Sequence, residues 1–349
     1  MSWEDNVRKV VPYTPGEQPK INNIIKLNTN ENPYPPAAAV SQTLADMDVS
    51  DFRKYPDPTC SLLVNAIASF YGLPAENVFV GVGSDDVLAM AFMTFFNSEK
   101  PILFPDITYS FYDVWADLFR IPYRQIPLND RFEIEEHDYF AENGGIVIAN
   151  PNAPTGVELP LSSIEEIVKR NPDVVVIVDE AYVDFGGESA LGLIDKYDNL
   201  LVVQTFSKSR SMAGMRIGYA FGCSKLIKYL SDVKFSFNSY TMNMPTLMLG
   251  AAAVSDKEYF EECCKKVVAT RERVKPLLAE LGFEFEDSKT NFIFAKHKEK
   301  HGKEIFDYLR QNGIIVRRFD RPRIDEYLRI SIGTDEEMDR LIEVLREFL

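Results

Sequence analysis

The stretch LLVVQTFSKSRSMAGMRIGYAFG, residues 200–222, carries the most informative pattern in the chain. Its two ends, LLVVQ and RIGYAFG, are short and rich in β-branched or aromatic residues, as buried strands are. Lys208 follows soon after the first of these strands. Because an ammonium group beside a buried strand loses hydration, the neutral amine is favoured there, and a neutral amine can attack an aldehyde. A Ser-Lys pair after a strand is weak evidence for such a nucleophile when taken alone, and it gains weight only from other residues that could bind the same ligand.

Five more apolar runs with strand character precede this stretch and alternate with helical patterns. Such alternation is typical of an α/β fold and predicts a mostly parallel, seven-stranded sheet between helices. The five runs are NVFVGVG (77–83), PILF (101–104), IPYRQIPL (121–128), GIVIA (145–149) and VVVIV (174–178).

The pattern changes after about residue 255, where a long charged helix is expected near 256–281. The strands FEF, NFIFAK, GIIVRR and YLRISIG follow it, interleaved with helices. We therefore expect three parts: an extended N-terminal arm over 1–25, a large domain over 26–255, and a smaller C-terminal α+β domain over 256–349.

Composition limits the classes of function. The chain has 349 residues, and its formal net charge of −15 argues against nucleic acid as a partner, because phosphate backbones are bound by basic surfaces. No apolar stretch approaches the roughly 20 residues that cross a bilayer, and the polar start MSWEDNVRKV lacks the apolar core of a signal peptide. We expect a cytoplasmic protein without a membrane partner.

Cysteine and histidine give no sign of a metal site. The four cysteines follow no metal-ligand spacing and suit reduced thiols. His297 and His301 lie four residues apart, but lysines surround them and no HExxH pattern is present, so a solvated surface is expected.

A carboxylate stands where the run VVVIV ends. Asp179 follows that run directly, at the end of the sheet where ligands of α/β proteins bind. It needs a cationic partner, and the protonated nitrogen of a pyridine ring would serve and keep such a ring an electron sink. Tyr182 could hydrogen-bond the phenolic oxygen of the same ring. An Asp N-cap beside a packed tyrosine is the structural alternative.

Two places could hold a phosphate group. Arg216 lies eight residues after Lys208 and could clamp a phosphate together with Ser207, and Gly214 and Gly218 would let the backbone approach the ligand. The second place is the glycine turn Gly83-Ser84-Asp85, which opens a helix whose first N–H groups attract anions, although taken alone an ordinary Ser N-cap is the favoured explanation. A GxGxxG fingerprint fails here because Asp86 occupies its last position. Tyr109 could stack on a cofactor ring or pack in the core.

Along nearly the whole chain, the order of four motifs resembles that of the fold type I pyridoxal-phosphate (PLP) aminotransferases. The motifs are GSD, NPNAPTG (150–156), DEAY, and SK followed by GMRIG. LNTNENPYPP (27–36), RKYPDP around Tyr55 and LRISIG (328–333) narrow the resemblance to the histidinol-phosphate aminotransferase family. The resemblance implies PLP as cofactor and transamination between histidinol phosphate and 2-oxoglutarate, a step of histidine biosynthesis.

The resemblance also implies residue roles. Lys208 would form the Schiff base with PLP and shuttle the proton, Asp179 would contact the pyridine nitrogen, and Tyr182 the phenolic oxygen. Tyr109 would stack on the ring, and Tyr55 would reach the cofactor phosphate of the neighbouring subunit, so an active homodimer is implied. The cofactor phosphate would be held by Gly83, Ser84, Asp85, Ser207 and Arg216.

One departure from the family lies in the motif NPNAPTG, whose usual form is NPNNPTG. Ala153 replaces the asparagine that normally touches the phenolic oxygen, and Asn152 is the nearest substitute. For the substrate, Arg329 matches the arginine that binds its anionic end, with assistance from Arg317. The cluster Arg317, Arg318, Arg321 and Arg323 could be a phosphate site or a solvated loop. Tyr13, Asn30 and Tyr240 are expected as pocket walls.

Several alternatives share part of this pattern. An aromatic amino acid aminotransferase and a threonine-phosphate decarboxylase have the same cofactor motifs. A PLP-sensing regulator would carry an added DNA-binding domain, for which the chain has no room before the arm. The failed glycine fingerprint disfavours a nicotinamide-dependent oxidoreductase.

Overall fold

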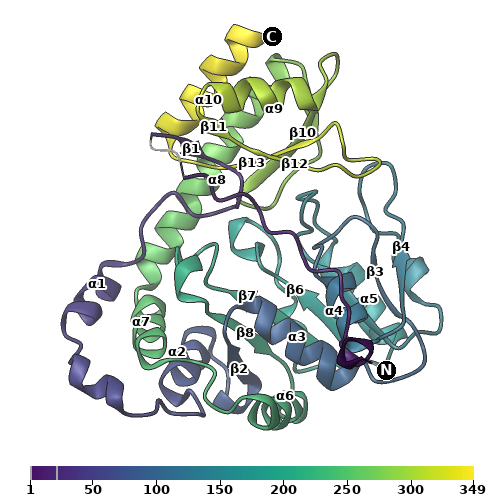
Figure 1. Ribbon diagram of the computed structural model, residues 1–349, viewed down its shortest axis with the longest axis vertical. Helices are drawn as coiled ribbons and strands as arrows, with labels where there is room; N and C mark the ends of the chain where they lie inside the picture. Colours follow the sequence, from purple (N-terminus) through teal and green to yellow (C-terminus); the bar gives the residue numbers. More distant parts are fainter. Residues whose placement is uncertain (1, 21–22) are drawn as a thin grey trace.

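The computed structural model describes residues 2–20 and 23–349 and places a large body below a smaller one (Figure 1). The large body is built on a seven-stranded sheet with strand order β2-β8-β7-β6-β5-β3-β4. All neighbouring strands are parallel except β8, which runs antiparallel to both β2 and β7. The strands are β2 (Val78–Gly81), β3 (Ile102–Pro105), β4 (Tyr123–Ile126), β5 (Gly145–Ala149), β6 (Val176–Asp179), β7 (Leu200–Thr205) and β8 (Gly218–Phe221).

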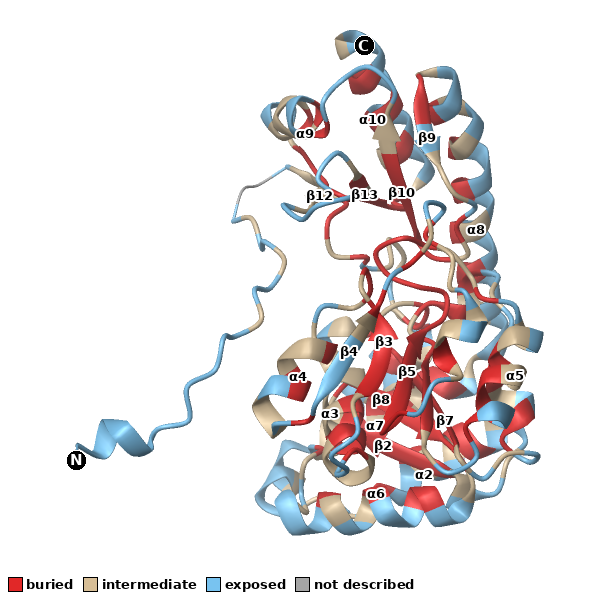
Figure 2. Cartoon of the chain, turned by 90° about the vertical axis from the view of Figure 1, so that its right-hand side faces the viewer, coloured by how far each residue is buried: buried red, intermediate tan, exposed pale blue. Residues whose placement is uncertain are grey.

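Helices cover both faces of this sheet, because successive side chains of a strand point to opposite faces and here both faces are apolar. Val176 and Val178 share a core with α2, α5 and α7, whereas Ile177 lies in the core under α3, α4 and α6. The helices of the large body are α1 (Ala38–Ala45), α2 (Ser61–Tyr71), α3 (Ser84–Phe95), α4 (Tyr112–Phe119), α5 (Leu161–Arg170), α6 (Ser224–Phe237) and α7 (Met244–Ser255). Figure 2 shows the buried sheet between exposed outer helix faces.

The smaller body contains a four-stranded antiparallel sheet of order β12-β13-β10-β9, packed against three helices. The long helix α8 rises from the large body into it (Figure 1). Its elements are α8 (Lys257–Glu280), β9 (Phe283–Phe285), β10 (Phe292–His297), α9 (Gly302–Gln311), β11 (Ile314–Ile315), β12 (Arg317–Arg318), β13 (Leu328–Ser331) and α10 (Asp335–Phe348).

A short parallel ladder joins the two ends of the chain. β1 (Ile25–Lys26) pairs with β11, so that Ile25 lies opposite Ile314. Leu27 continues the contact by donating its N–H to Ile315 and accepting from the N–H of Ser331. The segment that follows β1 is therefore fastened to the smaller body.

The predicted α/β fold and its seven strands are confirmed, with small differences in bounds. VVVIV becomes a strand only from Val176 and continues to Asp179. GIIVRR divides at Val316 because its first half pairs with β1 and its second half with β13. Short 3-10 helices lie at Trp3–Asn6, Val49–Arg53, Ala75–Asn77, Glu136–Tyr139, Val183–Phe185, Ala190–Leu193 and Ala213–Met215.

Residues 7–20, after the first 3-10 helix, have no regular structure but contact both bodies. Arg8 donates to the Leu118 carbonyl, Tyr13 stacks on Phe111 with 4.2 Å between ring centroids, and Glu17 pairs with Arg310. The predicted boundaries of arm, large domain and small domain stay predictions. No helix in the described part of the chain is long and apolar enough to cross a membrane.

Candidate active site

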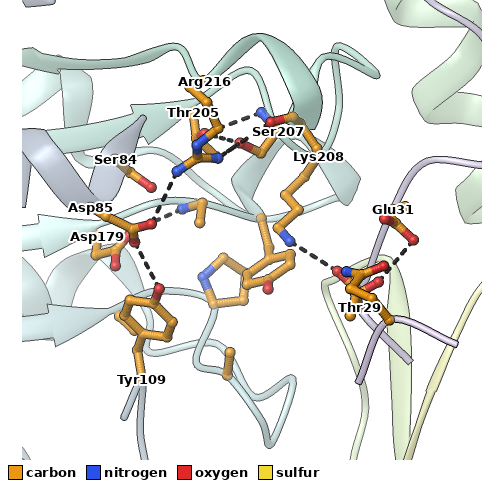
Figure 3. A pocket seen from close by; sticks show the side chains of 17 residues that line it. Thr29, Glu31, Ser84, Asp85, Tyr109, Asp179, Thr205, Ser207, Lys208 and Arg216 are labelled. Atoms are coloured by element: carbon orange, nitrogen blue, oxygen red, sulfur yellow. Dashed lines mark hydrogen bonds and ion pairs between the residues drawn. The ribbon is translucent and has the colours of Figure 1, made fainter. Parts of the chain in front are cut away.

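A pocket lies at the carboxyl ends of the sheet strands, and Thr29 and Glu31 of the segment after β1 complete its lining (Figure 3). Parallel strands end at one edge of a sheet, so residues that follow different strands can meet there. Most residues predicted for the cofactor do meet in its lining: Ser84, Asp85, Tyr109, Asp179, Tyr182, Ser207, Lys208 and Arg216.

At one end of the pocket, a glycine turn and an arginine form a cationic corner. Gly83 has φ +86° and precedes α3, whose first backbone N–H groups have no partner within the helix. A Cβ on Gly83 would collide with the guanidinium of Arg216, and a Cβ on Gly218 would collide with the backbone of Gly83. Glycine is thus required at both positions. At Gly214, in contrast, a Cβ would have no atom within 4 Å, so the space there does not require glycine.

The side chains of this corner hold one another. Arg216 Nη2 lies 3.1 Å from Asp85 Oδ2, and its Nη1 donates to Ser207 Oγ at 3.4 Å. The hydroxyl of Tyr109 donates to Asp85 Oδ1 at 2.7 Å. Because a carboxylate repels a phosphate, Asp85 could serve a phosphate only through its backbone N–H and by orienting Arg216.

Asp179 lies deeper in the pocket, at the end of β6. It is buried, and its Oδ2 accepts a hydrogen bond of 2.8 Å from the hydroxyl of Tyr112, a residue that the sequence pattern did not single out. Burial raises the pKa of Asp179 to about 6, because desolvation disfavours the carboxylate. A cation placed against this carboxylate would offset that cost.

Lys208 extends into the pocket from the turn after β7 (Figure 3). Its Nζ donates to the carbonyl of Thr29 at 3.2 Å and lies 5.6 Å from the ring centroid of Tyr182. Asn32 donates to the carbonyls of Lys208 and Ser209. Residues of the segment after β1 therefore hold both the amine and the backbone of Lys208, which sequence reasoning had not anticipated.

Asn152 does not reach the pocket. Its Nδ2 donates to the Ile107 carbonyl and to Thr155, and its Oδ1 accepts from Thr108 at 2.7 Å. All of these partners lie in the two loops that it joins, so the side chain has no N–H donor left for a ligand in the place of the asparagine that Ala153 replaces. Tyr182 is contacted instead by Asn30, whose Nδ2 donates to its hydroxyl at 2.9 Å.

A second pocket adjoins the first and contains Tyr13, Asn30, Arg317 and Arg329 in its lining. Arg329 Nη2 donates to the Asn28 carbonyl at 2.9 Å, whereas its buried Nε has no partner among residues 2–20 and 23–349. Burial lowers the pKa of this guanidinium. A half-buried guanidinium without a counter-charge in the described chain is suited to an anionic ligand.

The other predicted arginines do not converge on this pocket. Arg318 pairs with Asp320, and Arg323 pairs with Asp106 and with the carbonyls of Leu128 and Asn129. Arg321 is exposed. Of the four arginines, Arg317 alone lies in the lining of the second pocket, which favours the alternative of a solvated loop for the other three.

Tyr55 and Tyr240 also lie outside both pockets. Their rings contact each other at 4.7 Å between centroids, and Tyr55 is 80% exposed. His297 and His301 contact Leu281 and Glu326 respectively, away from the site.

Comparison with known proteins identifies the family. The family model described as "Aminotransferase class I and II" matches residues 22–345. The histidinol-phosphate aminotransferase of Lactococcus lactis subsp. cremoris is 50% identical over 349 residues, covering 100% of this chain and 98% of the relative. That of Acinetobacter baylyi is 53% identical over 351 residues, with 99% and 97% covered. The crystal structure of the histidinol-phosphate aminotransferase from Sinorhizobium meliloti in complex with pyridoxal-5'-phosphate superposes with a TM-score of 0.84 at 23% identity, covering 93% and 92%.

Proposed function

Because the chain belongs to the histidinol-phosphate aminotransferases, within the class I and II aminotransferase family, we propose that the Lys208 pocket is where it exchanges an amino group. The reaction interconverts histidinol phosphate and 2-oxoglutarate with imidazole-acetol phosphate and glutamate, in histidine biosynthesis. The relatives do not favour the aromatic aminotransferase or the threonine-phosphate decarboxylase. The observation that carries the placement is that an amine, a buried carboxylate and a cationic corner, each from a different strand end, share one pocket.

The residues of this pocket fit the cofactor PLP. The ring nitrogen of PLP, when protonated, is the cation that the buried Asp179 lacks. The corner formed by Arg216, Ser207 and the start of α3 suits a phosphate group. Lys208 supplies the amine for the aldehyde. When bound, PLP withdraws electrons from the substrate's Cα and so makes the Cα proton removable.

The chain's own residues then have separate tasks. Lys208 would take the proton from the substrate's Cα and deliver it to the C4′ carbon of the cofactor. Asp179 keeps the ring nitrogen protonated, and Tyr182 donates to the phenolic oxygen. Arg329, with Arg317, binds the phosphate end of histidinol phosphate, since the guanidinium is desolvated and geometrically suited to phosphate oxygens.

The active form is a homodimer in this proposal. Tyr55 is exposed and lies outside the lining of both pockets of its own chain, so a role at the cofactor phosphate requires a second copy. The location in the cytoplasm also stays a prediction.

The placement is tested by loading Lys208→Ala with PLP and recording its visible spectrum and turnover. We expect loss of the visible band and of transamination, while Lys228→Ala, an exposed lysine on α6, keeps both. Retention of the band in Lys208→Ala would refute the placement. Turnover of the unaltered enzyme on histidinol phosphate, phenylalanine and threonine phosphate tests the substrate, and histidinol phosphate must be the best of the three.

A further inference from the structure

Three buried side chains form a hydrogen-bonded line from the smaller body to the pocket. Ser331, on β13, bonds to Asn30 in two ways: its Oγ accepts from the Asn30 backbone N–H at 2.9 Å and donates to Asn30 Oδ1 at 2.9 Å. Asn30 Nδ2 in turn donates to the Tyr182 hydroxyl at 2.9 Å. Asn30 is 1% exposed and Ser331 is 2% exposed, so water does not compete for these groups.

The backbone N–H of Asn30 fixes which group donates and which accepts in each hydrogen bond of this line. The backbone N–H of Asn30 can only donate, so Ser331 Oγ must accept it and keeps one proton of its own. That proton points to Asn30 Oδ1, which orients the amide with its Nδ2 toward Tyr182. The tyrosine oxygen therefore receives a hydrogen bond. Its own proton has no acceptor among residues 2–20 and 23–349, and the side chain lines both pockets.

We propose that Asn30 is a positioning residue for Tyr182: its amide occupies an acceptor site of the hydroxyl and so directs the tyrosine proton into the pocket, toward the phenolic oxygen of PLP. The inference rests on the proposed placement of PLP against Tyr182. It goes beyond the expectation that Asn30 is a wall of the substrate pocket.

This arrangement explains how the chain works with Ala153. The family's usual asparagine at that position touches the phenolic oxygen, and Ala153 has no hydrogen-bonding side chain to do so. Both amide protons of Asn152 are donated within its loops, so it cannot donate to the phenolic oxygen either. The remaining donor is Tyr182. A hydroxyl that is already held in the right orientation forms a stronger hydrogen bond than a freely rotating one, because no rotational entropy is lost when the bond forms.

The backbone of Asn30 is built for this task. Its φ of +55° is left-handed, a conformation that asparagine tolerates better than most residues. The carbonyl of Asn30 accepts from Asn291 Nδ2 at 3.0 Å, so both main-chain polar groups of the residue are bonded to the smaller body. The amide is thus held by residues that do not themselves line the cofactor pocket.

The test uses the pH titration of the visible absorbance of bound PLP, whose midpoint falls when the phenolic oxygen is stabilised as an anion. Asn30→Asp replaces the donor by an acceptor, which would draw the tyrosine proton away from the pocket. Asn30→Gly removes the side chain but suits the left-handed backbone. Each is compared with Tyr182→Phe and with the double variants Asn30→Asp/Tyr182→Phe and Asn30→Gly/Tyr182→Phe. Ser331→Ala probes the next bond in the line.

We expect Tyr182→Phe and Asn30→Asp to raise the midpoint by about one pH unit, the size of one lost hydrogen bond to a charged atom. Asn30→Gly and Ser331→Ala should raise it less. In the Tyr182→Phe background, both Asn30 changes should have no further effect. Additive shifts, or no shift from Asn30→Asp while Tyr182→Phe shifts, would overturn the inference and leave the proposed function standing. An unshifted Tyr182→Phe would instead refute the placement of PLP against Tyr182, and the inference with it.

Discussion

The hydroxyl of Tyr112 donates to Oδ2 of Asp179 across 2.8 Å, and both side chains are buried. Tyr112 is a neutral donor, so it orients the carboxylate without supplying the positive charge that would stabilise it. Desolvation therefore dominates and raises the pKa of Asp179 to about 6. The protein holds a carboxylate in a costly state that a cationic ring nitrogen would relieve.

Asp179→Asn should abolish most of the transaminase activity. The amide keeps the size of the carboxylate and can still accept from Tyr112, but it cannot keep a ring nitrogen protonated. We expect kcat to fall by at least about 100-fold, as for other losses of a charge-stabilising group. The kcat of Tyr112→Phe should fall far less, because this variant leaves the carboxylate of Asp179 in place. Comparable losses in the two variants would contradict a dominant role for the charge.

Asp179→Asn should also stabilise the PLP-free protein at high pH. The folded pKa of Asp179, about 6, lies above its ordinary value of 3.8, so the folded state binds the proton more tightly than the unfolded state. Stability from this group is present below about pH 4 and is lost as pH rises through 6. At pH 8 we expect Asp179→Asn to exceed the unaltered protein by on the order of 2 kcal/mol in unfolding free energy, with no gain near pH 4.

Urea unfolding at several pH values measures that difference. The neighbouring Glu180, whose pKa burial raises to about 7, adds the same slope to both proteins and so cancels. Saturation with PLP should remove the advantage of the variant, since bound PLP stabilises the protein that retains Asp179. A pH-independent difference would mean that the carboxylate is not destabilising.

Arg216→Lys should weaken PLP binding. Lysine keeps the charge but cannot contact Asp85 and Ser207 while also presenting two parallel N–H groups to a phosphate. We expect the Kd for PLP, measured by equilibrium dialysis, to rise about 10- to 100-fold. Arg340→Lys, on the exposed face of α10, is the matched control. An unchanged Kd would remove Arg216 from the phosphate site.

Arg329→Gln should raise the KM for histidinol phosphate by about 100-fold, because an anion that meets a desolvated guanidinium gains a strong charge-assisted bond. The KM of Arg329→Lys should rise less, since lysine keeps the positive charge. Arg321→Gln, from the same region of sequence but exposed, should leave KM unchanged. If Arg321→Gln raises KM as much as Arg329→Gln, the loop rather than the second pocket binds the phosphate.

Mixing two inactive variants tests whether Tyr55 serves the neighbouring copy. Tyr55→Ala and Lys208→Ala should each be impaired, yet refolding them together should restore about a quarter of the normal activity, because each mixed dimer then has one intact site. Sedimentation velocity checks that dimers form. If Tyr55 acts within its own chain, the mixture stays as inactive as its components.

The sequence predicted the sheet well because its strands are strongly apolar and are bounded by turns. It also identified the residues that follow single strands, such as Asp179 and Lys208, because strand ends of α/β sheets meet in space. The family and its reaction were likewise predicted correctly, from motifs spread along the chain.

Contacts between distant segments were beyond sequence reasoning. The segment Asn28 to Asn32 was predicted only as a family signature and, at Asn30, as a pocket wall, although it holds Lys208 and Tyr182. Tyr112 resembled any other buried aromatic residue. Arg323 looked like part of a phosphate site, yet Asp106, more than two hundred positions away, already pairs with it. Such partners are set by tertiary packing, and no local spacing reveals them.

The pairing of β1 with β11 has a consequence for biosynthesis. Ile25 leaves the ribosome long before its partner Ile314 is made. Until then, the segment after β1 has neither its ladder nor Ser331 to hold it. A nascent chain can assemble the central sheet, yet its cofactor site stays incomplete until the segment from Ile314 to Ser331 has been made. Capture of PLP is thus a late event, and ribosome-bound chains that end before Ile314 should bind it poorly.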